Sequence, residues 1–321
     1  MRNILFSSLI VILFMFSCKH ETEIKVIRIA TLKGPSAMGM VKMIDSLNQI
    51  ENFKVEISIY NEPIQVRKLM LEEEVDLAIL PTTMGAILYN KGVPYQVAAI
   101  PVWGTLYLFG SNSKITSWKD LKGKKINLMA KGMTPDVLFK HLLIKNGINP
   151  KHDVILDYTF PTHIDLANAI AAGQAELGVI SEPLVSLVMQ KNKNVTPIFD
   201  LNAEWQKVYK NTPIAQTALL VNSEFSKNNK NELDFILNEY EKSTNWVSNN
   251  LLEAAKLIVK HKILPNTNIA ESSIPRSNLH FEKAFLIKDQ IQEYLNIFYE
   301  MNPDIIGGKI PDDNFYLNCE E

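Results

Sequence analysis

Hydrophobic and polar positions follow two periods along the chain, and the stretch 27–44 shows both. Its first residues alternate between apolar and polar, which predicts a short β-strand, and from Met40 the apolar residues recur at helical spacing. The turn Lys33-Gly34-Pro35-Ser36 lies between the two periods, and Ser36 is a residue type that caps helices. A strand that runs directly into a helix N-terminus offers free N–H groups to an anionic or acceptor-rich ligand. An ordinary βα turn is the alternative.

Two further strand-turn-helix units follow. The alternating segment 54–60 predicts a strand that ends at Asn61-Glu62-Pro63, and the continuously apolar segment 75–80 predicts a buried parallel strand that ends at Pro81-Thr82-Thr83. Three such units in succession predict a doubly wound α/β sheet with right-handed crossovers. Ligands of such sheets bind outside the carboxyl ends of the strands. We therefore expect Lys33, Ser36, Asn61, Thr82 and Thr83 at one edge of the sheet.

A second set of units begins at Lys125. The turn 130–136 again places glycine, threonine and proline before a helix, here through Thr134, and a later buried strand ends at Ser181-Glu182-Pro183. The repeated order predicts two lobes of similar build that face each other. The apolar stretches 106–109 and 217–221 predict a two-strand hinge. This assigns residues 25–108 and 217–321 to the first lobe and 109–216 to the second, with a mostly helical tail that includes a helix over 281–299.

The N-terminus has the pattern of a secretory signal peptide over residues 1–17. Met1-Arg2-Asn3 gives a positive start, and an apolar run too short to span a bilayer comfortably leads to Ser17-Cys18. A small residue and then cysteine resembles the bacterial lipobox, in which the cysteine is acylated. We therefore expect Cys18 to carry lipid and residues 18–24 to form a polar tether that holds an exported protein at the membrane.

Composition narrows the classes of function. The chain of 321 residues, 46% hydrophobic, is long enough to bury a sizeable core, and its net charge of −2 without a basic run argues against nucleic acid as a partner. Its two cysteines, Cys18 and Cys319, give no disulfide framework if the first is acylated, and the six histidines show no metal-ligand spacing. We expect no cofactor and no metal.

Taken together, five segments resemble the type II periplasmic binding proteins that feed ABC importers, in the nitrate, sulfonate, taurine and thiamine-pyrimidine group. They are KGPSAM, VDLAILPTTMGA, SWKDLKGKKI, AIAAGQAELGVISEP and TALLVNSEF. The resemblance covers residues 25–299. It implies a monomeric, non-catalytic protein that closes two lobes around one small molecule and delivers it to a permease with its ATPase. It also implies that ligand contacts come from the turns described above, at Ser36, Thr82, Thr83, Thr134 and Glu182, with Trp103 and Asn61 nearby.

The solute and two other functions stay open at this stage. Helix N-termini favour an anion, which Lys33 could neutralise, whereas Tyr60, Trp103 and Phe160 could stack a small heterocycle. One alternative is a ligand-sensing surface lipoprotein without a transporter. Another is a thiamine-pyrimidine synthase-like enzyme on the same fold, which needs a histidine and iron ligands; His141, His152 and His163 form no obvious ligand set. The exported N-terminus argues against the enzyme.

Overall fold

The structure is a computed structural model that describes residues 25–47, 53–111, 114–210 and 212–318. The expected signal peptide and the whole expected tether, residues 18–24 with Cys18, lie outside these residues, as does Cys319. None of the helices that the structure describes is long and apolar enough to cross a bilayer. The strands are β1 (Lys25–Leu32), β2 (Phe53–Tyr60), β3 (Leu77–Pro81), β4 (Tyr95–Val102), β5 (Leu106–Gly110), β6 (Lys125–Asn127), β7 (Ile155–Asp157), β8 (Leu177–Ser181), β9 (Thr196–Asp200), β10 (Thr217–Asn222) and β11 (Leu279–Lys283).

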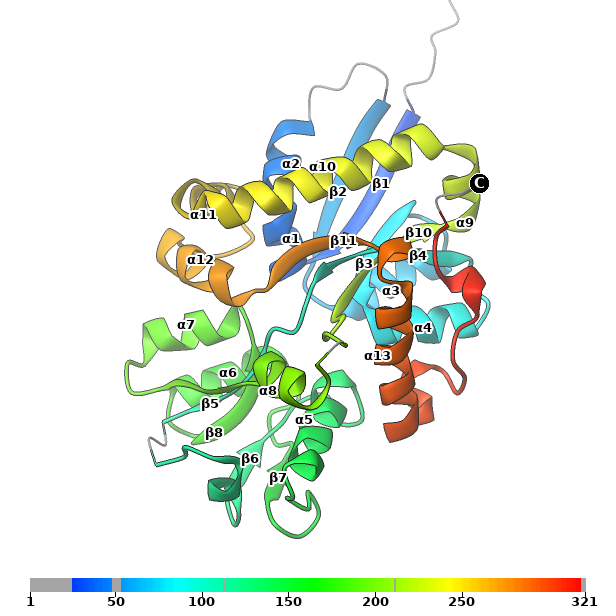
Figure 1. Cartoon of the computed structure of the whole chain (residues 1–321). Helices are drawn as coiled ribbons and strands as arrows, with labels where there is room; N and C mark the ends of the chain where they lie inside the picture. The colour runs from blue at the N-terminus through cyan, green and yellow to red at the C-terminus, as the bar shows by residue number, and fades with distance from the viewer. Residues whose placement is uncertain (1–24, 48–52, 112–113, 211, 319–321) are drawn as a thin grey trace, which may run out of the picture.

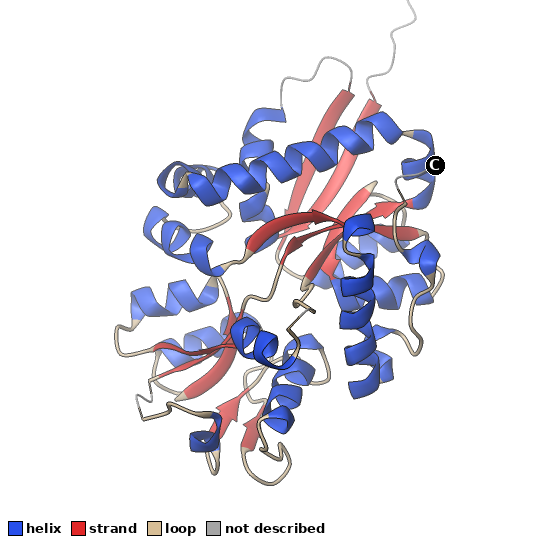
Figure 2. Ribbon diagram, viewed as in Figure 1, coloured by secondary structure: helices blue, strands red, loops and turns tan. Residues whose placement is uncertain are grey.

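Helices flank both groups of strands (Figure 2). The α-helices are α1 (Pro35–Gly39), α2 (Val41–Ser46), α3 (Pro63–Leu71), α4 (Thr82–Asn90), α5 (Thr134–Lys145), α6 (His163–Ala171), α7 (Leu184–Lys191), α8 (Leu201–Val208), α9 (Ser223–Asn228), α10 (Lys230–Asn249), α11 (Leu251–Lys260), α12 (Thr267–Ser273) and α13 (Lys288–Met301). A short 3-10 turn, η3 (Ile274–Arg276), follows α12 directly.

The strands form two mixed sheets with the same internal order. The first sheet runs β11-β4-β10-β3-β1-β2 and the second β7-β6-β8-β5-β9, so that β1, β2 and β3 correspond to β6, β7 and β8. In each sheet the three corresponding strands are parallel, and the strand that arrives from the other lobe, β10 or β5, pairs antiparallel beside them. Figure 1 shows the first sheet above the second. The expected two-lobed α/β fold is confirmed.

The chain crosses between the sheets in two neighbouring segments, 103–105 and 209–216. The Thr105 N–H donates to Gln216 Oε1 at 2.7 Å, and Gln216 Nε2 donates to Thr105 Oγ1 at 2.7 Å. A Cβ at Gly104 would lie 2.7–2.9 Å from the side chain of Asn202, so the crossing needs a glycine there. These contacts tie the two crossing segments to each other.

Two segments differ from the sequence-based expectation. Residues 106–108 pair with β8 and β9 as part of β5, so they lie in the second sheet, whereas we expected them in the first lobe. The helix expected over 281–299 begins only at Lys288, because residues 279–283 form β11 and pair antiparallel with β4. Phe281, which seemed to start a helix, is instead buried from a strand against Tyr240.

An aromatic cluster joins the lobes beside the second crossing segment. Trp205 on α8 is fully buried, and its ring centroid lies 6.2 Å from that of Phe298 and 6.4 Å from that of Tyr294, both on α13. Its Nε1 donates to the Thr212 carbonyl at 2.7 Å, which satisfies the indole inside the core. The C-terminal helix α13 therefore packs on both lobes, and Phe298 is a core residue as the sequence suggested.

Candidate functional site: the cleft between the lobes

Two helix N-termini meet where the lobes face each other. Helix α4 begins after β3 in the first lobe, and α5 begins after β6 in the second. Thr83 Oγ1 lies 2.8 Å from Thr134 Oγ1, so the two hydroxyls share a hydrogen bond between the lobes. Thr83 is buried, with 4% of its surface exposed, and Thr134 is half-buried. The structure thus brings together two predicted residues that are 51 positions apart.

A buried carboxylate fixes the turn that carries Thr134. The Asp136 side chain accepts hydrogen bonds from the Gly132 N–H at 2.7 Å, from Lys140 Nζ at 2.8 Å and from the Tyr158 hydroxyl at 2.6 Å. Gly132 has a φ of +80°, which glycine adopts without strain. Burial, together with the Asp136 carboxylate, raises the pKa of the Tyr158 hydroxyl, so tyrosine stays a donor at neutral pH. The network holds the start of α5 in place.

The turn after β1 lies against the second lobe. A Cβ on Gly34, whose φ is +146°, would come within 3.7 Å of Pro183 Cδ, at the start of α7. Ser36 is buried, but it is the second residue of α1 rather than the cap we expected, because the helix begins at Pro35 with Gly34 in the capping position. Lys33 is exposed, and its backbone N–H donates to the Tyr60 carbonyl at 2.7 Å.

Thr82 uses its polar groups to hold the crossing segment. Its hydroxyl donates to the Ala215 carbonyl at 2.5 Å, and its N–H donates to the Gln216 carbonyl at 3.1 Å. The side chain is fully buried. This arrangement gives Thr82 a structural role beside the site, and Thr83 is the residue of the pair that reaches across the cleft.

Glu182 forms a buried ion pair between the lobes. Arg276 Nε donates to its Oε1 at 2.5 Å, and Ser186 donates to the same carboxylate from its hydroxyl at 2.9 Å and its N–H at 3.2 Å. The Glu182 side chain has no exposed surface. Burial raises the pKa of Glu182, while the Arg276 guanidinium opposes the rise. Sequence reasoning missed Arg276, because no local pattern links it to a residue 94 positions earlier.

Two other predicted residues lie apart from the Thr83–Thr134 contact. Trp103 is 8% exposed, and its Nε1 donates to the His280 carbonyl at 2.7 Å beside a cavity of about 450 Å³ that α8, β11 and α13 line. Asn61 is exposed, and its N–H donates to Gln65 Oε1 at 3.2 Å at the start of α3. Neither contact involves a residue of the second lobe's turns.

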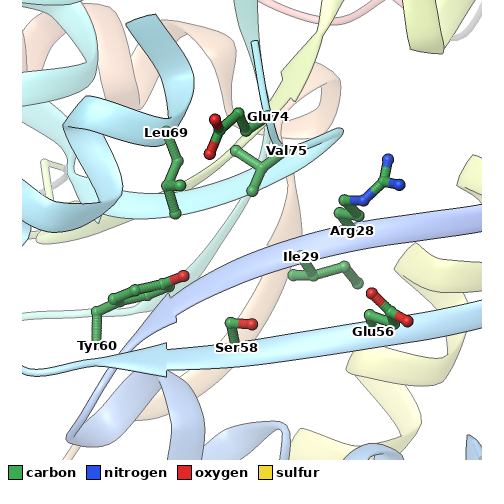
Figure 3. A pocket seen from close by; sticks show the side chains of 8 residues that line it. All are labelled: Arg28, Ile29, Glu56, Ser58, Tyr60, Leu69, Glu74 and Val75. Atoms are coloured by element: carbon green, nitrogen blue, oxygen red, sulfur yellow. The ribbon is translucent and has the colours of Figure 1, made fainter. Parts of the chain in front are cut away.

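A separate cavity of about 400 Å³ lies along β1 and β2 (Figure 3). Tyr60 lines it at one end, and Arg28 and Glu56 line it further along the same strands. All of its lining residues belong to the first lobe, so closing the lobes would not enclose a solute there. Tyr60, which we considered for stacking a ring in the cleft, faces this cavity.

Two histidines of the second lobe each lie close to a hydroxyl group. His141 Nε2 lies 2.7 Å from the Tyr209 hydroxyl, and His163 Nδ1 lies 3.4 Å from Ser181 Oγ. Burial lowers the pKa of each to about 4, so both are neutral at neutral pH. Within the parts of the chain that the structure describes, no three His, Cys, Asp or Glu side chains could hold a metal ion.

A two-lobed α/β fold of this kind is typical of periplasmic binding proteins. Residues 36–258, more than half of the chain, match the family described as "ABC transporter, phosphonate, periplasmic substrate-binding protein". The chain therefore belongs to this family of ABC-type substrate-binding proteins, as the sequence resemblance predicted at the level of the type II group. Its relatives by family and structure are binding proteins rather than enzymes. No match was found among curated protein sequences.

Several solved structures of ABC-type binding proteins are similar to this chain. An ABC transporter protein from Parabacteroides distasonis is 26% identical, with a TM-score of 0.79 over 92% of this chain and 100% of that one. The aliphatic sulphonate binding protein SsuA from Escherichia coli is 18% identical, with a TM-score of 0.71 over 90% and 95%. The nitrate-binding protein NrtA from Synechocystis is 16% identical, with a TM-score of 0.62 over 88% and 84%. The last two show similarity of fold.

Proposed function

We propose that this protein is the exported, lipid-anchored binding component of an ABC importer, and that it captures a small oxyanion in the cleft at Thr83 and Thr134. The observation that carries the proposal is the meeting of two helix N-termini, one from each lobe, with a hydroxyl on each. A helix N-terminus combines free N–H donors with the positive end of the helix dipole. An oxyanion placed between them would accept hydrogen bonds from both lobes at once.

Charge and aromatic placement favour an oxyanion over a ring. Lys33 is exposed in the first-lobe turn, and Lys131 is exposed three residues before Thr134. Both ammonium groups would add to the attraction for an anion. Tyr60 faces the β1–β2 cavity and Trp103 is bonded to β11, so neither belongs to the Thr83–Thr134 contact. Phosphonate, sulphonate and nitrate, named for the family and two structural neighbours, are all small oxyanions.

In this proposal the lobes close on the solute before the protein delivers it. The protein acts as a monomer that Cys18 holds at the membrane by its lipid, and it closes on the solute and hands it to a permease driven by an ATPase. The hydroxyl pair Thr83–Thr134 would separate in the open form and admit the solute.

A thermal-shift screen of residues 19–321 tests the proposal. The panel contains phosphonates, taurine, alkanesulfonates, nitrate and bicarbonate, with aminopyrimidines, thiamine and riboflavin as the ring class. A solute at 100 times its dissociation constant adds about 2.7 kcal/mol to the free energy of unfolding. We expect one oxyanion to stabilise the protein, with the shift reduced in Thr83→Ala and Thr134→Val and kept in Ser248→Ala, which removes a hydroxyl on α10. Stabilisation by the ring class alone would contradict the oxyanion assignment.

A further inference from the structure

A groove with a mixed polar and apolar lining lies between the lobes, next to the Glu182–Arg276 ion pair. It has a volume of about 350 Å³ and is lined from the second lobe by Ser186, Gln190 and Lys193 and from the first lobe by Asn268, Ser272 and Arg276, among others. It shares no residue with the Thr83–Thr134 contact. Its volume falls within the range of small-molecule sites in proteins.

The cationic side of the groove is held in a fixed orientation. Arg276 Nε is bonded to Glu182 and Arg276 Nη2 donates to Ser186 Oγ at 2.6 Å, so two of the five N–H groups are engaged within the protein. The carboxylate behind it is fully buried, whereas 29% of the Arg276 side chain is exposed. A guanidinium fixed in this way offers its remaining N–H groups to an oxygen ligand with little loss of side-chain entropy.

The charges of the residues that line the groove also favour an anionic ligand. Lys193 adds a second cation, and Asn268, Ser272 and Gln190 add amide and hydroxyl groups. None of the residues that line the groove is acidic, and Glu182 carries the one carboxylate bonded to Arg276. Two cations against one carboxylate leave an excess of positive charge facing the groove.

We propose that this groove is a second binding site, which takes a small free oxyanion between the Arg276 guanidinium and the Lys193 ammonium. A guanidinium matches the geometry of phosphate or a carboxylate, and an ammonium adds a point charge. Since both lobes contribute lining residues, an occupant would strengthen the contact between α7 and α12, which the amides of Gln190 and Asn266 already bridge at 3.2–3.4 Å.

Isothermal titration of residues 19–321 with inorganic phosphate tests the site. We expect binding by the unmodified chain, weakened by at least about fivefold in Lys193→Ala through loss of a charged hydrogen bond. Lys191→Ala is the matched control, because it removes an exposed lysine two residues away that donates a hydrogen bond to Asn168. The affinity of this variant for phosphate should be unchanged. Asn268→Asp places a negative charge on an exposed lining position and should abolish binding without disturbing the core.

Three results would overturn the proposal. The first is that the unmodified chain does not bind phosphate at millimolar concentration. The second is that Lys193→Ala and Lys191→Ala bind phosphate with equal affinity. The third is that Thr134→Val loses phosphate binding while Lys193→Ala keeps it. The last result would assign phosphate to the cleft. Conversely, groove binding together with a silent solute screen would leave this site standing and count against the proposed function alone.

Discussion

The lobes contact each other through several polar contacts, two of which differ strongly in chemistry. Across the cleft, Thr83 and Thr134 share one neutral hydrogen bond, and beside it Glu182, Arg276 and Ser186 form a buried, charged cluster. A neutral hydrogen bond contributes about 0.5–1.5 kcal/mol net, whereas removing one partner of a buried ion pair costs about 3–5 kcal/mol. We therefore expect the lobes to separate at the cleft contact while the α7–α12 contact persists.

The largest expected effect comes from breaking the charged contact. Arg276→Ala leaves the fully buried Glu182 carboxylate without its cation, and the free energy of unfolding should fall by about 3–5 kcal/mol. Urea denaturation measures the loss. The double variant Glu182→Gln/Arg276→Met removes both charges and should recover most of it. Equal losses in the single and double variants would show that the charge itself contributes little.

A methyl group at the crossing should have the next largest effect. In Gly104→Ala the new Cβ would lie 2.7–2.9 Å from Asn202 atoms, so the crossing segment has to shift, at a cost of about 1–3 kcal/mol. Because this segment joins the two lobes, the change tests whether the crossing sets the geometry of the contacts between them. Adding Asn202→Gly removes the Asn202 Cβ, Cγ and Oδ1 atoms that the new methyl group would meet, so it should restore part of the stability in the same denaturation assay. A failure to restore it would place the strain elsewhere.

Removing the cleft contact should cost little. Thr83→Ala and Thr134→Val each delete the same hydrogen bond, so each should lower the free energy of unfolding by about 1 kcal/mol. The double variant should lose less than the sum of the two, because the hydroxyls act as a pair. A loss above about 3 kcal/mol in either single variant would contradict the weak character assigned to this contact, since net hydrogen bonds rarely reach that value.

The effect that is smallest at neutral pH is that of His141, which acts as the pH falls. Burial lowers the pKa of His141 to about 4, and the neighbouring Lys145 acts in the same direction, whereas an unfolded histidine titrates near 6.5. The unfolded chain therefore binds more protons between these values, and stability present above pH ~6.5 is lost as the pH falls toward ~4. His141→Gln, which can still bond to Tyr209, should flatten this part of the stability profile. An unchanged slope would contradict the assignment to His141.

The strand-turn-helix units and the turns that follow the strands could be predicted from the sequence. The contacts between residues far apart in the sequence could not. The turn before Thr134 and the edge that carries Thr83 follow from strand-helix periodicity and the rule that ligands bind at carboxyl ends of strands. The meeting of Glu182 with Arg276 depends on how α12 and η3 pack on the second lobe, which no local pattern encodes. Likewise, the burial of Trp103 depends on β11, a segment that the sequence suggested was helical.

Pulsed electron paramagnetic resonance on two doubly spin-labelled variants tests the central claim most directly. One variant, Ile64→Cys/Met133→Cys, labels one exposed position on each lobe, and the other, Lys191→Cys/Glu271→Cys, labels exposed positions on α7 and α12. Serine replaces Cys319 in both. The account predicts a broad or two-peaked distance distribution for the first pair, narrowed by the solute, and one narrow, unchanged distance for the second. Distances that change as much between α7 and α12 as across the cleft would contradict it.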